Sequence, residues 1–188
     1  MKKICGAGLA MALMLAGVVS SASAAPYVAG NFGMVSVNDS TLSGNSSGEL
    51  SFDSGFGFIA AIGNGFDGLR AEAEISYRTN DLDTPVNGDI SSLAVMGNLL
   101  VDLDISESVR PFLGAGMGLA NVEIDGDSDS SDDTVFAYQA IAGIGFPLTH
   151  VTTLDLQYRY FASADPDFDG TEAEYQTHNF FAGLRFDF

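Results

Sequence analysis

Hydrophobic and polar residues alternate one by one in the last segment of the chain, residues 178–188. One side of this segment carries the apolar residues Phe180, Ala182, Leu184, Phe186 and Phe188. The other side is mainly polar and includes Arg185 and Asp187, with Phe181 as an exception. A period of two is that of a β-strand, in which successive side chains point to opposite faces. An apolar face in lipid and a polar face in a lumen would explain the pattern.

Residues 69–78 and 154–160 alternate in the same way. In the first of these segments, Arg70, Glu72, Glu74 and Arg78 all fall on one face. A helix would distribute these charges around all of its sides, whereas a strand separates them from the apolar residues. Weaker alternation predicts five more strands, at 27–37, 52–62, 92–103, 110–122 and 135–146.

With the terminal segment, eight strands are predicted, each about long enough to cross a hydrocarbon layer at a tilt. Their connections alternate in length. The short ones are 63–68, 104–109 and 147–152, and the long ones are 38–51, 79–91, 123–134 and 162–175. The sequence therefore predicts an all-β fold, an eight-stranded antiparallel up-and-down transmembrane β-barrel. Both termini and the short turns would lie in the periplasm, and the long loops outside.

The beginning of the chain has the composition of a secretory signal peptide. Lys2 and Lys3 are followed by an apolar stretch and by the small residues of Ala22-Ser23-Ala24. We expect residues 1–24 to be a signal peptide and residues 25–188 to form one barrel domain. An uncleaved membrane anchor is the alternative, but the apolar stretch is shorter than the roughly 20 residues that span a bilayer. The single cysteine, Cys5, lies in the signal, so the mature chain would have no disulfide or thiolate site.

Several segments together resemble a known family. They are Tyr27-Val-Ala-Gly-Asn-Phe-Gly33, Arg70-Ala-Glu-Ala-Glu74, Pro111-Phe-Leu-Gly-Ala-Gly116, Tyr138-Gln-Ala-Ile-Ala-Gly143, Tyr158-Arg-Tyr-Phe161 and the terminal strand. In order and spacing, over the whole mature chain, they resemble the small eight-stranded outer-membrane barrels related to OmpA, OmpX and the opacity proteins.

This resemblance implies a location in the bacterial outer membrane. The partners it implies are outer-membrane lipid, lipopolysaccharide and the barrel assembly machinery. It also implies an assembly signal in the last strand, formed by Gly183, Phe186 and Phe188. Phe181 departs from the family pattern, which usually has a polar residue at that position.

Charge is distributed unevenly along the chain. Residues 25–188 contain five arginines, no lysine and all 25 acidic residues, a net charge of −20. The predicted strand faces place eight of the charged residues in the lumen, namely Arg70, Glu72, Glu74, Arg78, Asp102, Asp155, Arg159 and Arg185. We expect them to form an interior charge network, because each buried charge needs a partner and the planar guanidinium can bind several carboxylates.

The interior of an eight-stranded barrel is about filled by its side chains, which favours a closed lumen. The alternative is a narrow porin-like channel for small solutes or cations. Glycines on the predicted inner face bear on this choice, because they would flatten the lumen or leave a water pocket. They are Gly114, Gly116, Gly118, Gly143 and Gly145.

The remaining acidic residues gather in the predicted external loops. Such a surface argues against nucleic acid as a ligand and favours divalent cations or basic surface ligands. Asp165, Asp167 and Asp169 have the spacing of a calcium-binding loop, but Gln176 stands where a bidentate glutamate belongs. A solvated anionic loop is the alternative, so weak calcium binding is the only cofactor that the sequence suggests.

Catalytic chemistry has few candidates. His150 falls in a predicted turn and His178 on the lipid-facing row, where interfacial anchoring is its expected role. Glu72 and Glu74 share a face, but the arginines beside them favour a salt network over a carboxylate pair. We therefore expect a monomeric, non-enzymatic barrel with a structural or adhesion-type surface role. A secreted, soluble lipocalin-like barrel is the remaining alternative.

Overall fold

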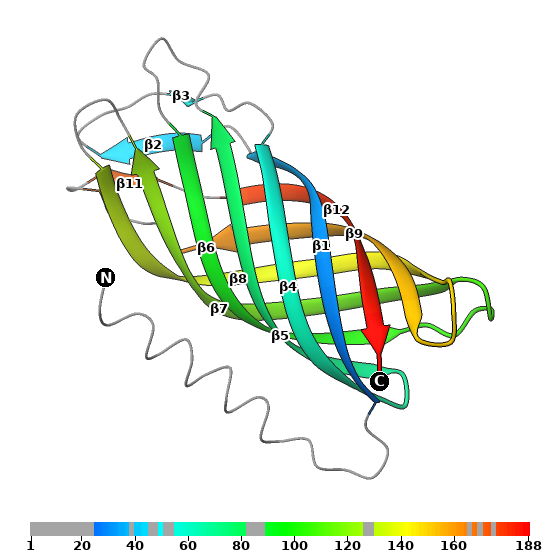
Figure 1. The fold of residues 1–188 in the computed structure, drawn as a ribbon. Coiled ribbons are helices and arrows are strands. Elements are labelled where there is room, and N and C mark those ends of the chain that lie inside the picture. Colours follow the sequence, from blue (N-terminus) through cyan, green and yellow to red (C-terminus); the bar gives the residue numbers. More distant parts are fainter. Residues whose placement is uncertain are drawn as a thin grey trace.

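The computed structural model describes residues 25–37, 40–44, 49–50, 55–81, 89–125, 130–164, 167–168, 171–173 and 176–188. Eight long strands in these residues form a closed barrel (Figure 1). They are β1 (Ala25–Val37), β4 (Gly55–Phe66), β5 (Leu69–Asp81), β6 (Asp89–Asp102), β7 (Arg110–Asp125), β8 (Ser130–Pro147), β9 (Thr152–Ser163) and β12 (Gln176–Asp187). The predicted fold class is confirmed.

The strands are antiparallel and follow the order β1-β12-β9-β8-β7-β6-β5-β4 around the barrel. Closure depends on β1, which pairs with β12 on one side and with β4 on the other. Phe32, for example, lies opposite Ala182 on β12 and opposite Phe58 on β4. A closed sheet leaves no unpaired edge, so the backbone groups of all eight strands can be satisfied in lipid.

One end of the barrel, which we call the turn end, holds the connections β4–β5, β6–β7 and β8–β9. Strand β1 begins and strand β12 ends there (Figure 1). The β4–β5 connection is only two residues long, Asp67 and Gly68, with φ of 45° and 83°. These positive angles are those of a tight hairpin turn that favours Asp-Gly. The predicted turn at 63–68 was too long, because so tight a turn lets β4 continue to Phe66.

At the opposite end, the loop end, two hairpins extend further than predicted. Strand β7 continues to Asp125 and β8 begins at Ser130, so most of the predicted loop 123–134 is paired strand. The buried Val122 and Val135 continue the inner apolar rows into this region. In addition, Asn121 Nδ2 donates a hydrogen bond to Thr134 Oγ1 across the pair (3.2 Å). Strands β5 and β6 likewise pair as far as Asp81 and Asp89.

A second, smaller sheet joins two of the predicted loops. It consists of β2 (Ser40–Gly44), β3 (Glu49–Leu50), β10 (Asp167–Phe168) and β11 (Thr171–Ala173), in the order β10-β11-β2-β3. Its labelled strands lie beyond the loop end of the barrel in Figure 1. Pairing of β11 with β2 connects segments about 130 residues apart in the chain and gives partners to their backbone groups.

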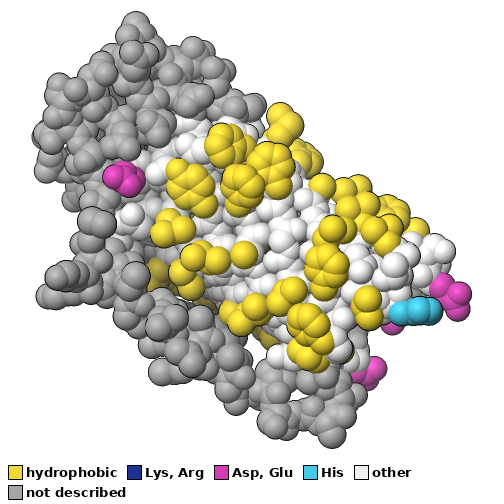
Figure 2. All heavy atoms as spheres, in the orientation of Figure 1, with side chains coloured by type: hydrophobic (Ala, Val, Ile, Leu, Met, Phe, Trp, Pro, Cys, Tyr) yellow, Lys and Arg dark blue, Asp and Glu magenta, His cyan; other side chains and the backbone are white. Residues whose placement is uncertain are grey.

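The outward face of the barrel carries a continuous band of apolar side chains. Figure 2 shows this band on one face of the molecule, where no lysine or arginine side chain is visible. The exposed residues of the band include Phe32, Phe58, Ile75, Leu93, Leu99, Leu113, Met117, Phe136, Leu156, Phe180 and Leu184. Each barrel strand contributes four to six outward apolar or small positions, which matches the height of a hydrocarbon layer. No helix in the described ranges is long and apolar enough to cross a membrane.

Candidate functional site: the packed lumen

Strand alternation turns all eight residues of the predicted interior charge network into the lumen. Seven are buried, and Asp102, at the turn end, is partly exposed. They come from four strands, with Arg70, Glu72, Glu74 and Arg78 on β5, Asp102 on β6, Asp155 and Arg159 on β9, and Arg185 on β12. The structure distributes them over three levels along the barrel axis rather than in one cluster.

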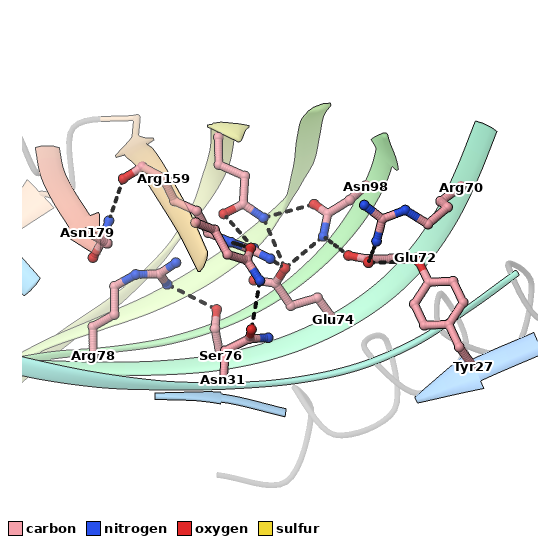
Figure 3. A network of polar contacts seen from close by, with 12 residues as sticks. Tyr27, Asn31, Arg70, Glu72, Glu74, Ser76, Arg78, Asn98, Arg159 and Asn179 are labelled. Carbon is pink, nitrogen blue, oxygen red and sulfur yellow. Dashed lines mark hydrogen bonds and ion pairs between the residues drawn. The ribbon is translucent and has the colours of Figure 1, made fainter. Parts of the chain in front are cut away.

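At the middle level, Glu74 and Arg159 form an ion pair across the lumen, with 2.5 Å between Oε2 and Nη1. Their strands β5 and β9 lie four positions apart in either direction around the eight-stranded ring. Glu74 Oε2 also accepts hydrogen bonds from Asn98 Nδ2 (2.7 Å) and Gln139 Nε2 (3.2 Å). Figure 3 shows these side chains converging from several strands.

The network continues from Arg159 to the other wall. Arg159 Nε donates to Gln157 Oε1 (2.9 Å), and Gln157 Nε2 donates to Asn31 Oδ1 on β1 (2.7 Å). Asn179 Nδ2 on β12 donates to the backbone oxygen of Arg159 (3.0 Å). Polar side chains from β1, β5, β6, β8 and β9 are therefore joined in a single layer. The uncharged residues Asn98 and Gln157 join the charged ones in this network, and sequence reasoning missed Asn31 and Gln139.

At the turn end, Arg70 bridges two acidic residues. Its Nη2 lies 2.8 Å from Asp102 Oδ1 and its Nη1 lies 3.5 Å from Glu72 Oε1. The hydroxyl of Tyr27 donates to the same Glu72 oxygen (2.7 Å), and the guanidinium of Arg70 lies 4.7 Å from the ring centre of Phe112. These contacts hold the Arg70 side chain in one position.

Arg185 and Asp155 form a second turn-end pair, with 3.5 Å between Nε and Oδ2. The guanidinium of Arg185 also lies 5.6 Å from the ring centre of Tyr27. Tyr27 thus touches both halves of the turn-end level, and its inward position was not used in the sequence prediction. The alternation within residues 27–37 carried that information, because it places Tyr27 on the same face as Asn31.

The inward glycines leave room for large neighbours. A β-carbon on Gly143 would lie 2.3 Å from the ring of Phe112, and one on Gly116 would lie 1.9 Å from Asn98 Oδ1. The bare wall predicted at these positions is therefore filled by the side chains of Phe112 and Asn98. At these two positions, neighbouring side chains occupy the space that a water pocket would need.

Towards the loop end, the lumen changes character. Inward residues of β6, β7, β8 and β9 form a buried apolar cluster of Ile90, Ala94, Met96, Ala120, Val122, Val135, Ala137 and Phe161. The guanidinium of Arg78 lies 4.1 Å from the ring centre of Phe161, and its Nη1 donates to Ser76 Oγ (3.0 Å). Sequence reasoning did not predict this cluster, because β6 to β8 are largely apolar on both faces.

The terminal strand shows where its predicted assembly residues lie. Phe186 and Phe188 are exposed on the outside, and the backbone nitrogen of Phe188 donates to the Pro26 oxygen (3.0 Å). A β-carbon on Gly183 would meet Asn31 Oδ1 at 2.1 Å, so this glycine makes room for Asn31. Phe181 is buried with Val35 and Ile59 in a second apolar cluster. The assembly role itself stays a prediction.

The candidate metal residues fall largely outside the described part of the chain, so the calcium site stays a prediction. Asp165 and Asp169 lie outside the described residues, and of Asp167 only the backbone is described, in β10. Within the described ranges, no group of three or more His, Cys, Asp or Glu side chains could hold a metal ion. His150 lies in the exposed β8–β9 turn, while His178 lies on the outward face of β12, near the other end of the barrel.

Comparisons with known proteins agree with this architecture. The family model of the outer membrane protein beta-barrel domain matches residues 6–188. The crystal structure of Neisserial surface protein A is similar, with a TM-score of 0.65 and 19% identity over 88% of this chain and 99% of that one. The outer membrane protein OprG from Pseudomonas aeruginosa gives a TM-score of 0.58 and 13% identity, covering 88% and 96% of the two chains.

Curated relatives match over shorter stretches. An uncharacterised protein of Brucella abortus (strain 2308) is 32% identical over 121 residues, which cover 55% of this chain and 42% of the relative. One of Brucella suis biovar 1 is 35% identical over 88 residues, or 39% of this chain and 31% of the relative. The chain thus spans less than half the length of these relatives. Since the family match covers nearly the whole sequence, the chain belongs to the outer-membrane proteins that share this eight-stranded β-barrel domain.

Proposed function

We propose that this protein is a non-conducting outer-membrane barrel that presents acidic loops at the cell surface, in a structural or adhesion-type role. The observation that carries the proposal is the ion pair of Glu74 and Arg159, which bridges opposite walls of the lumen. Polar partners flank this pair, and an apolar cluster lies above it towards the loop end. A lumen packed in this way supports a role for the barrel as a rigid anchor.

The orientation belongs to the same proposal. The turn end, with both β1 and β12 termini, would face the periplasm, and the loop end would face the exterior. Short turns on one side and longer loops on the other are the usual arrangement of outer-membrane barrels. The barrel assembly machinery and outer-membrane lipid, including lipopolysaccharide, would then be its partners during and after insertion. A monomer is proposed, because the barrel closes on itself and needs no second chain.

Acidic loops set the class of surface ligand. Residues 123–133 contain six acidic residues, and residues 165–174 contain five, with no lysine or arginine in either segment. A surface of this charge attracts basic proteins or divalent cations and repels nucleic acid. A non-catalytic role is part of the proposal, because the two histidines are far apart along the barrel and the inner carboxylates pair with arginines.

Conductance in planar bilayers tests the proposal directly. The purified barrel, confirmed as folded by a gel mobility that changes on boiling, should give no reproducible conductance step. Such a step, in preparations of that folded form, would favour the alternative of a narrow channel for small solutes or cations. A folded preparation is essential, because misfolded protein can also permeabilise a bilayer.

The surface role needs a separate measurement. A fluorescent lysine-rich peptide should bind barrel-containing vesicles in a salt-dependent way. Changing the acidic residues of 123–133 to their amides should weaken this binding by about tenfold, because the attraction is electrostatic. The matched control changes Asp67 and Asp104 at the turn end to Asn, which should leave binding to outward-facing loops intact. Equal effects of the two sets would contradict the proposed surface.

A further inference from the structure

His178 lies in a small polar cluster on the outward, lipid-facing side of the barrel. It is directly opposite Tyr160 on β9 and opposite Ser36 on β1. The rings of Tyr158 and Tyr160, both on β9, have centres 6.0 and 5.4 Å from the imidazole centre. None of the residues that face His178 on β1 or β9 is charged.

The contact with Tyr158 favours one tautomer of His178. The Tyr158 hydroxyl lies 2.6 Å from Nδ1. An N–H donor usually lies about 2.7 Å or more from its oxygen acceptor, whereas hydroxyl donors reach shorter distances. The short separation therefore fits Tyr158 as the donor and Nδ1 as the acceptor. In the neutral ring the proton is then on Nε2, and no protein group among the described residues forms a hydrogen bond with that nitrogen.

The position of His178 along the barrel is that of a membrane interface. On β12 the outward row runs from Phe186 through Leu184, Ala182 and Phe180, and His178 is its first polar residue. The neighbouring strand β1 changes from Met34 to Ser36 at the same level, as the register shows. Lipid head groups begin where such an apolar band ends, and tyrosine rings are typical of that level.

Its basic side chain makes His178 distinctive at this level. Arg70, Arg78, Arg159 and Arg185 point into the lumen, and Arg110 and His150 lie at the turn end. The only other basic residues of the chain, Lys2 and Lys3, lie outside the described residues. In the described barrel, His178 is thus the only basic side chain on the outer surface near the loop end.

We propose that Nε2 of His178 donates a hydrogen bond to the phosphate of a lipid in the leaflet at the loop end. Tyr158 holds the ring by binding Nδ1, and Tyr160, whose hydroxyl donates to Gln176 Oε1 (2.8 Å), lies directly opposite His178 on β9. This inference rests on the proposed membrane location and adds a ligand class to it. Hydrogen bonds to a charged acceptor are the stronger kind, so one well-oriented donor can order a head group.

Solid-state NMR of the full barrel can test the contact. The His150→Phe variant has a single histidine, which is labelled with ¹⁵N. Bilayers of a phosphate-free galactolipid are compared with the same bilayers containing phosphatidic acid. The proposal expects the Nε2–H tautomer in both bilayers, and dipolar coupling between Nε2 and lipid ³¹P only when phosphatidic acid is present. Folded barrel without this coupling, or with the proton on Nδ1, would overturn the inference.

Two tyrosine variants test whether the coupling of His178 to lipid phosphate depends on Tyr158 or only on a position at the membrane interface. Tyr158→Phe removes the bond to Nδ1 and should reduce the ³¹P coupling by about half or more, because the ring is no longer held in one orientation. Tyr77→Phe, an outward tyrosine on β5, is the matched control and should change nothing. Equal loss in both variants would contradict the role given to Tyr158.

Two further results bear on the source of the phosphate and on the membrane location. Inorganic phosphate added to the galactolipid bilayers should give no coupling, and coupling of equal size would assign the site to a soluble anion instead. A barrel that does not insert into either bilayer would overturn the proposed function together with this inference. An inserted barrel without coupling would overturn this inference alone.

Discussion

Strands β5 and β6 face the same lumen with different chemistry. The inward row of β5 is charged or polar from Arg70 to Asn80, whereas that of β6 is mixed, with the fully buried Met96 and Leu100 beside polar residues such as Asn98. On the charged wall each side chain depends on partners from other strands, such as Arg159 for Glu74. Around Met96 and Leu100, stability depends on filled volume. The two walls should therefore respond differently to the removal of single side chains.

The largest expected effect is on the charged wall. Arg159→Ala leaves the buried carboxylate of Glu74 without its ion-pair partner, which should lower the free energy of unfolding by about 3–5 kcal/mol. Urea unfolding in lipid vesicles, followed by circular dichroism, measures this change. The chain contains no tryptophan whose fluorescence could report unfolding, so circular dichroism is the suitable signal.

The double variant Glu74→Gln with Arg159→Gln is the control for this prediction. It removes both charges at once and keeps groups that can form hydrogen bonds, so it should be clearly more stable than Arg159→Ala alone. A double variant that is less stable than the single one would mean that packing, rather than charge compensation, is the main contribution of Arg159.

On β6, Met96→Ala should cost about 2–4 kcal/mol of unfolding free energy, because it opens a cavity in a packed cluster. Met117→Ala is the matched control, since Met117 lies on the outward face, where lipid can fill the space. It should cost about 1 kcal/mol. The same unfolding measurement compares them, and similar losses would contradict a tightly packed loop-end lumen.

The inward glycines of β7 and β8 let large side chains of neighbouring strands pack close to their backbone. Gly143→Ala places a β-carbon against the Phe112 ring and should cost about 1–3 kcal/mol through overpacking. Gly30→Ala serves as the control, because a β-carbon there meets nothing within 4 Å. Its effect should stay within about 0.5 kcal/mol. Thermal unfolding, read from the gel mobility of heated samples, is sensitive enough to separate these outcomes.

The same contrast explains what the sequence could predict. On β5 and β9, charged and apolar residues alternate, so Glu74 and Arg159 could be assigned to the inner face without a structure. On β6 to β8, alternation is weak, because Met96 inside and Leu99 outside are both apolar. Lipid and a packed core favour the same residue types, and a pattern of polarity cannot distinguish them. The apolar cluster at the loop end was missed for this reason.

The ends of the strands were the second feature that the sequence did not predict. Residues 123–134 are rich in aspartate and serine, which usually indicate a loop, yet β7 and β8 pair through most of this segment. Pairing of β2 with β11 was equally inaccessible, because these short segments are far apart in the sequence and have no clear alternation. In both cases the partner strand, rather than local composition, determines the structure.

The smallest expected effect concerns the turn end, where Tyr27 of β1 contacts charged side chains of β5 and β12. Tyr27→Phe keeps the ring between Arg70 and Arg185 but removes the hydroxyl that donates to Glu72. The loss of this single bond to a charged group should lower the free energy of unfolding by about 1–2 kcal/mol, since Glu72 keeps its contact with Arg70. Tyr77→Phe, on the outward face, should change it by less than about 0.5 kcal/mol. If the two variants lose the same amount in urea unfolding, the Tyr27 hydroxyl contributes no more than an exposed one, and the turn-end level would be held by its arginines alone.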